Sequence, residues 1–154
     1  MKLFLRDIYF QMVVREATIA DYSEIHGIRL LVKENVLINH HKVTYEMYDE
    51  YLSHRGKGWL AEIDNRIVGF AIVDLKDNNI WALFIRPDFE KRGIGRQLHD
   101  VMMNWCFSKT RNHFWLSTDP KTRAEKFYRK AGWIEKEKKE NEIFFEMSYQ
   151  DWIN

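Results

Sequence analysis

The segment from Ile80 to Cys106 constrains the fold of this chain more than any other. It begins with an apolar run at residues 80–85, whose β-branched and aromatic residues favour a buried strand. Pro87 ends this strand, because proline has no N–H for a ladder bond and restricts the residue before it. A basic turn at residues 89–96 leads into a predicted helix. Its apolar residues recur at helical spacing: Ile94, Leu98, Val101, Met102, Trp105 and Cys106.

The basic turn has the features of an anion site. The first turn of a helix presents unpaired N–H groups and the positive end of the helix dipole. Gly93 and Gly95 would let a ligand approach the backbone without a Cβ in the way. Lys91, Arg92 and Arg96 add positive charge to the same place. We expect a bound phosphate or pyrophosphate here; the alternative is a surface loop with two glycines and solvated bases.

Composition restricts the class of protein. The chain has 154 residues, 45% of them hydrophobic and 15% aromatic, which predicts one folded domain and excludes a disordered chain. The net charge of +1 gives no reason to expect bulk attraction to nucleic acid or to an acidic membrane. The single cysteine, Cys106, excludes an internal disulfide, fits a reducing compartment and is expected to be a buried, inert thiol.

The N-terminal segment and the histidine pair carry no function in this interpretation. Residues 1–11 are expected to be an extension outside the domain, which would span residues 12–154, because Tyr9-Phe10-Gln11 resembles the end of a viral-protease cleavage site.

No run is long enough for a membrane span, and we find no signal peptide, so we expect a soluble cytoplasmic protein. His40 and His41 lack further ligands at usable spacing, so we expect loop residues and no metal site.

Periodicity, caps and turn residues predict the other elements. Strands are expected at residues 13–17, 58–63, 66–74, 80–85, 113–118, 133–138 and 142–147. Helices are expected after the caps Thr18 and Thr44, across residues 94–106, and over residues 121–130, where Gly132 ends the last one.

This order of elements resembles the GCN5-related N-acetyltransferase (GNAT) superfamily from Met12 to Met147. Arg92-Gly93-Ile94-Gly95-Arg96 looks like the loop that binds the pyrophosphate of acetyl-CoA, and residues 124–133 look like the helix that carries the family's tyrosine. The two signatures together, at this separation, make the resemblance specific. It implies an α/β (α+β) GNAT fold, with a mixed, mostly antiparallel sheet of about seven strands, a splay between strands 4 and 5, and four flanking helices.

Two positions depart from the family pattern. Glu90 stands where the family loop commonly has glutamine or arginine, and an acid near phosphate is unfavourable unless it points away. Lys121 stands where the family often has asparagine, which removes one cofactor contact. Lys121 or Arg123 could meet a phosphate in its place.

The resemblance implies an enzyme that transfers an acetyl group from acetyl-CoA, its co-substrate, to a primary amine. The backbone of Leu83, Phe84 and Ile85 would pair with the pantetheine arm, and the N–H of Ile85 would steady the developing oxyanion. Tyr128 would be the general acid for the leaving thiolate, or else only a core aromatic. The pyrophosphate would bind at Lys91, Arg92, Gly93, Ile94, Gly95 and Arg96.

The base and the acceptor remain open at this point. Glu34, Asp74 and Asp119 are candidates for deprotonating the amine, and a chain of water molecules would also suffice. The acceptor, a small molecule or a protein, would be selected by residues 35–42 and by Trp81, unless Trp81 belongs to the core. A non-catalytic acyl-CoA sensor of the same fold and a nucleotide-binding module are the alternatives. A homodimer is expected from the resemblance alone.

Overall fold

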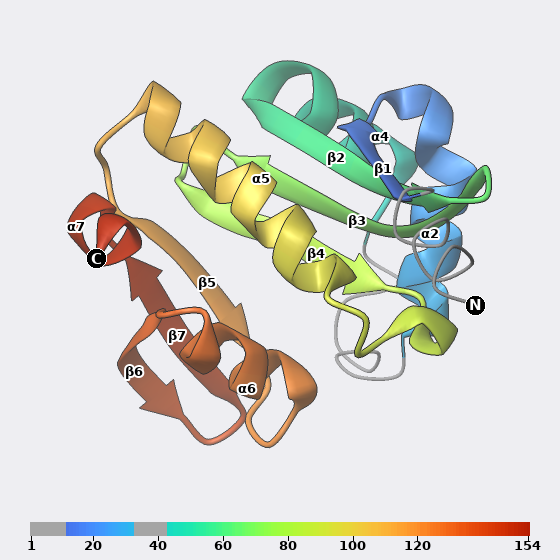
Figure 1. Ribbon diagram of the computed structural model, residues 1–154. Helices are drawn as coiled ribbons and strands as arrows, with labels where there is room; N and C mark the ends of the chain where they lie inside the picture. The colour runs from blue at the N-terminus through green and yellow to red at the C-terminus, as the bar shows by residue number, and fades with distance from the viewer. Residues whose placement is uncertain (1–11, 33–42) are drawn as a thin grey trace.

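The computed structural model describes residues 12–32 and 43–154, in which seven strands form one sheet (Figure 1). The strand order is β1-β2-β3-β4-β5-β7-β6. The bounds are β1 Met12–Glu16, β2 Gly56–Ile63, β3 Arg66–Asp74, β4 Asn79–Ile85, β5 Phe114–Thr118, β6 Ile134–Lys139 and β7 Glu142–Met147. Neighbouring strands are antiparallel except β4 and β5, which are parallel. This is the mixed, mostly antiparallel sheet that the resemblance implies.

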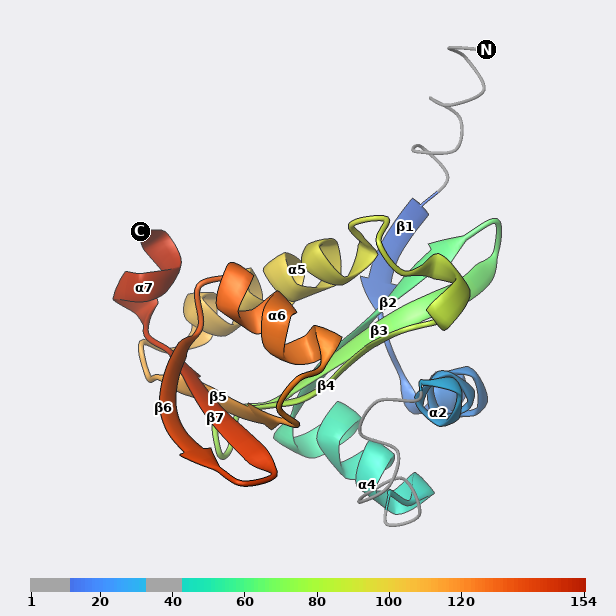
Figure 2. The same ribbon diagram turned by 90° about the horizontal axis from the view of Figure 1, so that it is seen from below.

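Helices cover both faces of the sheet (Figure 2). α5 (Ile94–Lys109) and α6 (Arg123–Lys130) lie on one face, and α2 (Tyr22–Leu31) and α4 (Tyr45–Glu50) lie on the other. Shorter pieces complete the chain: η1 (Ile19–Asp21), the π-helical turn η3 (Tyr51–Arg55), η4 (Pro87–Phe89) and α7 (Tyr149–Ile153). Within the two described stretches, none of the helices combines the length and apolarity needed to cross a bilayer.

Capping side chains explain where several helices begin. Thr44 and Thr122 each accept a backbone N–H in the first turn of α4 and α6. Lys121 adopts a left-handed backbone (φ 62°), so α6 begins at Arg123, two residues later than predicted. The capping box of Ser148 and Asp151 starts α7, a helix that the sequence analysis missed. Residues 1–11, Glu34, the connection 35–42, His40 and His41 lie outside the described residues.

The buried face of α5 is wider than the predicted apolar stripe. Ile94, Leu98, Met102 and Cys106 are buried as predicted, whereas Val101 is 37% exposed. Burial raises the pKa of the Cys106 thiol to about 12, which keeps it protonated and inert. The additional buried residues are His99, Met103 and Phe107. α7 helps to cover two of them, because its Trp152 ring contacts those of His99 and Phe107.

β4 separates from β5 almost as soon as the two strands meet. Asn79 and Trp115 are the one residue pair that joins them in the ladder. The Trp115 N–H donates to the Asn78 carbonyl (2.9 Å), and the Trp115 indole N–H donates to the Asp77 carbonyl (3.0 Å). A register shift beside Trp81 adds one residue to β4 opposite β3, which is a β-bulge. The rest of β4 then diverges from β5, which confirms the predicted splay (Figure 1).

Candidate functional site

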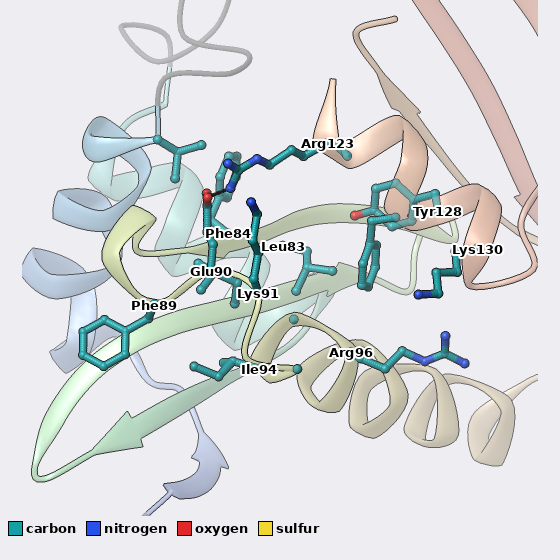
Figure 3. Close-up of a pocket in the computed structure, with 16 residues that line it drawn as sticks. Leu83, Phe84, Phe89, Glu90, Lys91, Ile94, Arg96, Arg123, Tyr128 and Lys130 are labelled. Carbon is teal, nitrogen blue, oxygen red and sulfur yellow. Dashed lines mark ion pairs between the residues drawn. The ribbon is translucent and has the colours of Figure 1, made fainter. Parts of the chain in front are cut away.

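A pocket of about 490 Å³ opens beside the diverging end of β4 (Figure 3). Its walls are residues 83–85 of β4, Val32 at the C-cap of α2, the loop and helix start at residues 89–96 except Arg92, and five residues of α6. The α6 residues are Arg123, Ala124, Phe127, Tyr128 and Lys130. Of the residues predicted to bind the cofactor, Arg92 alone does not line the pocket: it is exposed, and its guanidinium lies 4.9 Å from the Phe89 ring centre. The fold therefore brings the two sequence signatures together.

The N-terminus of α5 presents uncapped backbone amides to this pocket. Gly93 is the N-cap, with φ 81°, and within the described chain no side chain bonds to this helix end. The first intrahelical bond runs from the Gln97 N–H to the Gly93 carbonyl (3.1 Å). The N–H groups of Ile94, Gly95 and Arg96 consequently have no carbonyl acceptor within the helix. No acidic residue occupies the first turn, so the helix end is suited to an anion.

Gly95 lines the pocket at the start of α5. A Cβ built on Gly95 would lie 3.6 Å from Ile85 Cγ1 and 3.8 Å from Phe127 Cε2, which are ordinary van der Waals contacts. Its backbone angle is not in the left-handed region, so the fold itself would accept a Cβ there. The missing side chain instead leaves room for a ligand against the helix backbone. At Gly93 the reason for glycine differs, because φ of 81° strains any other residue.

Positive charge dominates the ionisable side chains of the pocket. The basic residues in the lining are Lys91, Arg96, Arg123 and Lys130, and the acidic one is Glu90. Glu90 forms an ion pair with Arg123 (Figure 3), so its carboxylate already has a cationic partner at the site of the predicted conflict. Lys121, the other residue considered for phosphate, does not line the pocket.

The end of β4 has backbone groups on its open side. The Arg86 N–H donates to the Val68 carbonyl (2.7 Å), which continues the antiparallel ladder between β4 and β3. Residues of an antiparallel pair alternate between those that bond to the neighbour and those that face away. The backbone N–H and C=O groups of Phe84 therefore face β3, as those of Arg86 do. The backbone groups of Leu83 and Ile85 face the opposite side, from which β5 has diverged.

Tyr128 combines a packed ring with a hydroxyl at the pocket. Its ring contacts Phe127, Trp133 and Phe145, with centroids 5.2, 5.8 and 6.4 Å away, and the residue is 7% exposed. The hydroxyl is directed toward the side where Leu83 lies (Figure 3). Burial raises the pKa of this phenol above its usual value, so it holds its proton across the neutral range.

The two described candidates for a general base do not border the pocket. Asp74 is 2% exposed, and Arg55 donates to its two carboxylate oxygens at 2.7 and 3.2 Å. In the ladder between β3 and β4, Asp74 lies opposite Asn79, which is at the other end of β4 from the pocket. Asp119 is absent from the lining, in which Glu90 is the acid present. Within residues 12–32 and 43–154, no cluster of three or more His, Cys, Asp or Glu side chains could hold a metal ion.

Sequence reasoning missed a cation among aromatic rings on the opposite face of the sheet. Arg29 of α2 lies against the rings of Tyr48, Trp81 and Phe84. Trp81 stacks on Tyr51 (centroids 4.2 Å apart) and is part of this packed group, and it does not line the pocket. The one signal in the sequence is the position of Arg29, a charged residue directly after Ile28, which is buried. The rings around Arg29 come from distant segments, so the sequence does not reveal that they meet.

Solved structures of acetyltransferases share this fold. The PaiA N-acetyltransferase of Thermoplasma acidophilum, in complex with coenzyme A, matches with a TM-score of 0.77 and 15% identity over 90% of this chain and 99% of that one. An acetyltransferase of the GNAT family from Staphylococcus aureus Mu50 matches with a TM-score of 0.76 and 21% identity, over 89% and 98% of the two chains. The ribosomal-protein-S18-alanine N-acetyltransferase of Escherichia coli gives 0.71 and 12%, over 89% and 93%. At these identities the likeness shows the fold alone.

The sequence comparison identifies the family directly. No curated protein sequence matches the chain. The model of the acetyltransferase (GNAT) family, however, matches residues 23–133, which contain β4, the α5 loop and the α6 helix that form the pocket. Because this match covers well over half of the sequence, the chain belongs to the acetyltransferase (GNAT) family.

Proposed function

We propose that this protein is an N-acetyltransferase that transfers the acetyl group of acetyl-CoA directly to a primary amine. Enzymes of the GNAT family use acetyl-CoA as their co-substrate. One observation carries the proposal: the uncapped helix end of α5, the open backbone edge at Leu83 and Ile85, and the Tyr128 hydroxyl all border one pocket. An acetyl-CoA acetyltransferase needs these three elements to hold a diphosphate, align a thioester and protonate a thiolate.

Donor binding would use both parts of the signature loop. The N–H groups at the start of α5 would hold the pyrophosphate, with Lys91 and Arg123 contributing charge from the lining. The pantetheine arm would lie along Leu83 and Ile85 as an added strand, since their backbone groups face away from β3. Gly95 leaves room for the ligand to approach the helix.

The chemical step is a direct attack of the amine nitrogen on the thioester carbonyl carbon. The Ile85 N–H would stabilise the negative charge that develops on the carbonyl oxygen. As the C–S bond breaks, the Tyr128 hydroxyl would give its proton to the leaving sulfur. The nitrogen loses one proton to water, and one proton from water restores the Tyr128 hydroxyl, so the net products are an amide and the free thiol of CoA.

The amine must reach the site without its extra proton. Deprotonating a lysine-like amine at pH 7 costs about 4–5 kcal/mol, given a pKa of about 10.4. Because Glu90, the acid of the described lining, is paired with Arg123, we favour a chain of water molecules as the route for this proton.

Thermal unfolding followed by a thiol-release assay tests this function. Acetyl-CoA and CoA should each raise Tm, and ATP at the same concentration should raise it much less. A panel of amines should then release free thiol, with acetylated product seen by mass spectrometry. Stabilisation by ATP and not by CoA would indicate a nucleotide-binding module. Stabilisation by CoA without thiol release on any amine would indicate a sensor.

A further inference from the structure

Arg29 of α2 lies three residues before Val32, the C-cap of this helix, which lines the pocket. Its guanidinium carbon is 4.8 Å from the ring centre of Phe84, which also lines the pocket, 5.1 Å from that of Trp81 and 5.8 Å from that of Tyr48. We call these three rings the Arg29 cage. Arg29 itself is absent from the lining, but it packs against Phe84, which is part of the wall on the α2 side.

The hydrogen bonds of Arg29 leave part of its guanidinium unused. The Nε–H donates to Tyr48 Oη (3.0 Å), and His26 Nδ1 lies 3.1 Å from the same oxygen. Nη2 is buried, and among residues 12–32 and 43–154 it has no hydrogen-bond partner and Arg29 has no carboxylate partner. Arg15 and Arg55, by contrast, each contact two carboxylates.

A guanidinium that pairs with no carboxylate of the described residues favours an incoming anion. Removing a cation from water is costly, and burial lowers the pKa of Arg29 against the opposing effect of Tyr48. The ring faces of the cage offset part of this cost. They cannot, however, accept the remaining N–H bonds in the way that a planar carboxylate does.

The two faces of the sheet separate this cation from the proposed phosphate site. α2 and α5 lie on opposite faces of the sheet (Figure 2). Phe84 packs with the α2 cluster, whereas Leu83 and Ile85 pack with the α5 cluster. The α5 helix end and Arg29 therefore approach the diverging end of β4 from opposite faces. A donor that lies along α5 leaves the α2 side to the second substrate.

We propose that Arg29 binds a carboxylate of the acceptor, so that the enzyme acetylates amines that also carry a carboxylate. This inference rests on the proposed function, which by itself leaves the acceptor open. The carboxylate belongs either to a free amino-acid-like amine or to an acidic side chain near the N-terminus of a peptide. Both sources present the same group to Arg29.

Matched pairs of acceptors test the inference on the wild-type protein. Glycine, phenylalanine and lysine are compared with methylamine, phenethylamine and cadaverine, which lack the carboxylate, by thiol release and by calorimetric binding with and without CoA. C-terminally amidated peptides with Asp or Asn at the second position distinguish the two sources. We expect at least one carboxylate-bearing member to have a kcat/KM or affinity on the order of 10- to 100-fold above that of its partner.

Variants of Arg29 test whether its guanidinium causes the preference for acceptors that carry a carboxylate. Arg29→Met should remove it mainly through KM of the carboxylate-bearing acceptor, and Arg29→Lys should restore part of it, while the KM for acetyl-CoA stays the same. Arg111→Met is the matched control, because Arg111 also lies over a ring, that of Tyr149 (3.8 Å), outside the pocket lining.

The outcomes separate the inference from the proposed function. If acetyl-CoA is used but no pair differs by more than about threefold in rate or binding, the inference is wrong and the acetyltransferase assignment stands. Equal losses for both members of a pair in Arg29→Met would also overturn it, since that result indicates a structural role. If CoA does not bind, the proposed function fails, while the binding comparison on the unliganded protein still decides the role of Arg29.

Discussion

Glu90 and Arg123 form an ion pair that joins the loop before α5 to the first residue of α6, and both side chains line the same pocket (Figure 3). The acid that departs from the family loop is thus matched by a cation from the second signature. This pair is partly exposed, with Arg123 56% and Glu90 28% accessible, so its contribution to stability is small.

Replacing Glu90 should strengthen donor binding. Glu90→Gln removes a negative charge beside the proposed phosphate site, so we expect acetyl-CoA to bind about 2- to 5-fold more tightly, as for a modest surface charge interaction. Arg123→Gln should weaken binding by a similar factor. Titration calorimetry at low and high salt measures both effects. Glu137→Gln, in an exposed pair with Lys139, is the control. Weaker binding by Glu90→Gln would contradict this account.

Removing the Tyr128 hydroxyl should affect catalysis and not binding. We expect Tyr128→Phe to lower kcat by about 10²- to 10³-fold, within the range for a lost general acid, with the Kd of acetyl-CoA unchanged. Burial raises the pKa of Tyr128, so the phenol is protonated throughout the usual assay range and wild-type kcat should show no alkaline loss below about pH 10. An unchanged kcat in the variant would leave Tyr128 as a core residue only.

His99 should make the fold sensitive to mild acid. Trp133 Nε1–H donates to His99 Nε2 (2.9 Å), so the proton of the neutral ring is on Nδ1, which donates to Asp100 (2.9 Å). Burial lowers the pKa of His99, despite the opposing effect of Asp100. The unfolded chain therefore binds a proton near pH 6.5 that the native protein does not, and the free energy of unfolding falls as pH decreases through that value.

Chemical denaturation at pH 7.5, 6.5 and 5.5 measures this effect. Wild type should lose up to about 1.4 kcal/mol per pH unit below pH 6.5 from this group. His99→Gln should be less stable at pH 7.5 but should lose less on acidification. His113→Gln, at an exposed histidine bonded to Glu146, should keep the wild-type slope. Parallel curves for wild type and His99→Gln would rule out His99 as the source.

The sequence predicts those features that are encoded locally. Pro87 marks the end of β4, and Gly93 marks the start of α5, so this strand, turn and helix can be placed from their own residues. The order of elements then implies the fold and its splay. The helix expected over residues 121–130 is present, but it begins at Arg123, because Lys121 is left-handed and Thr122 is the N-cap.

Features that depend on tertiary packing could not be predicted in this way. His99 is polar and was not assigned to the core, yet Trp133 and Trp152 enclose it from segments more than 30 residues away. Trp81 is the extra residue of the β4 bulge. Side chains of a regular strand alternate between the two faces of the sheet, and the bulge interrupts this alternation. Arg29 becomes notable only because Phe84 and Tyr48 arrive beside it in the folded chain.

A substitution at Gly95 is the best way to distinguish an effect on ligand binding from an effect on the stability of the fold. A Cβ at this position meets only ordinary van der Waals contacts in the protein, and a larger side chain would extend into the space proposed for the donor. Gly93→Ala is a less direct test, because φ of 81° imposes strain of about 1 kcal/mol on any other residue.

The binding of acetyl-CoA to wild type and to Gly95→Val, measured by titration calorimetry beside the Tm of both unliganded proteins, tests the central claim most directly. We predict the same Tm within a few degrees and an affinity at least tenfold weaker in the variant. Equal affinity in two equally stable proteins would contradict the placement of the diphosphate at the start of α5.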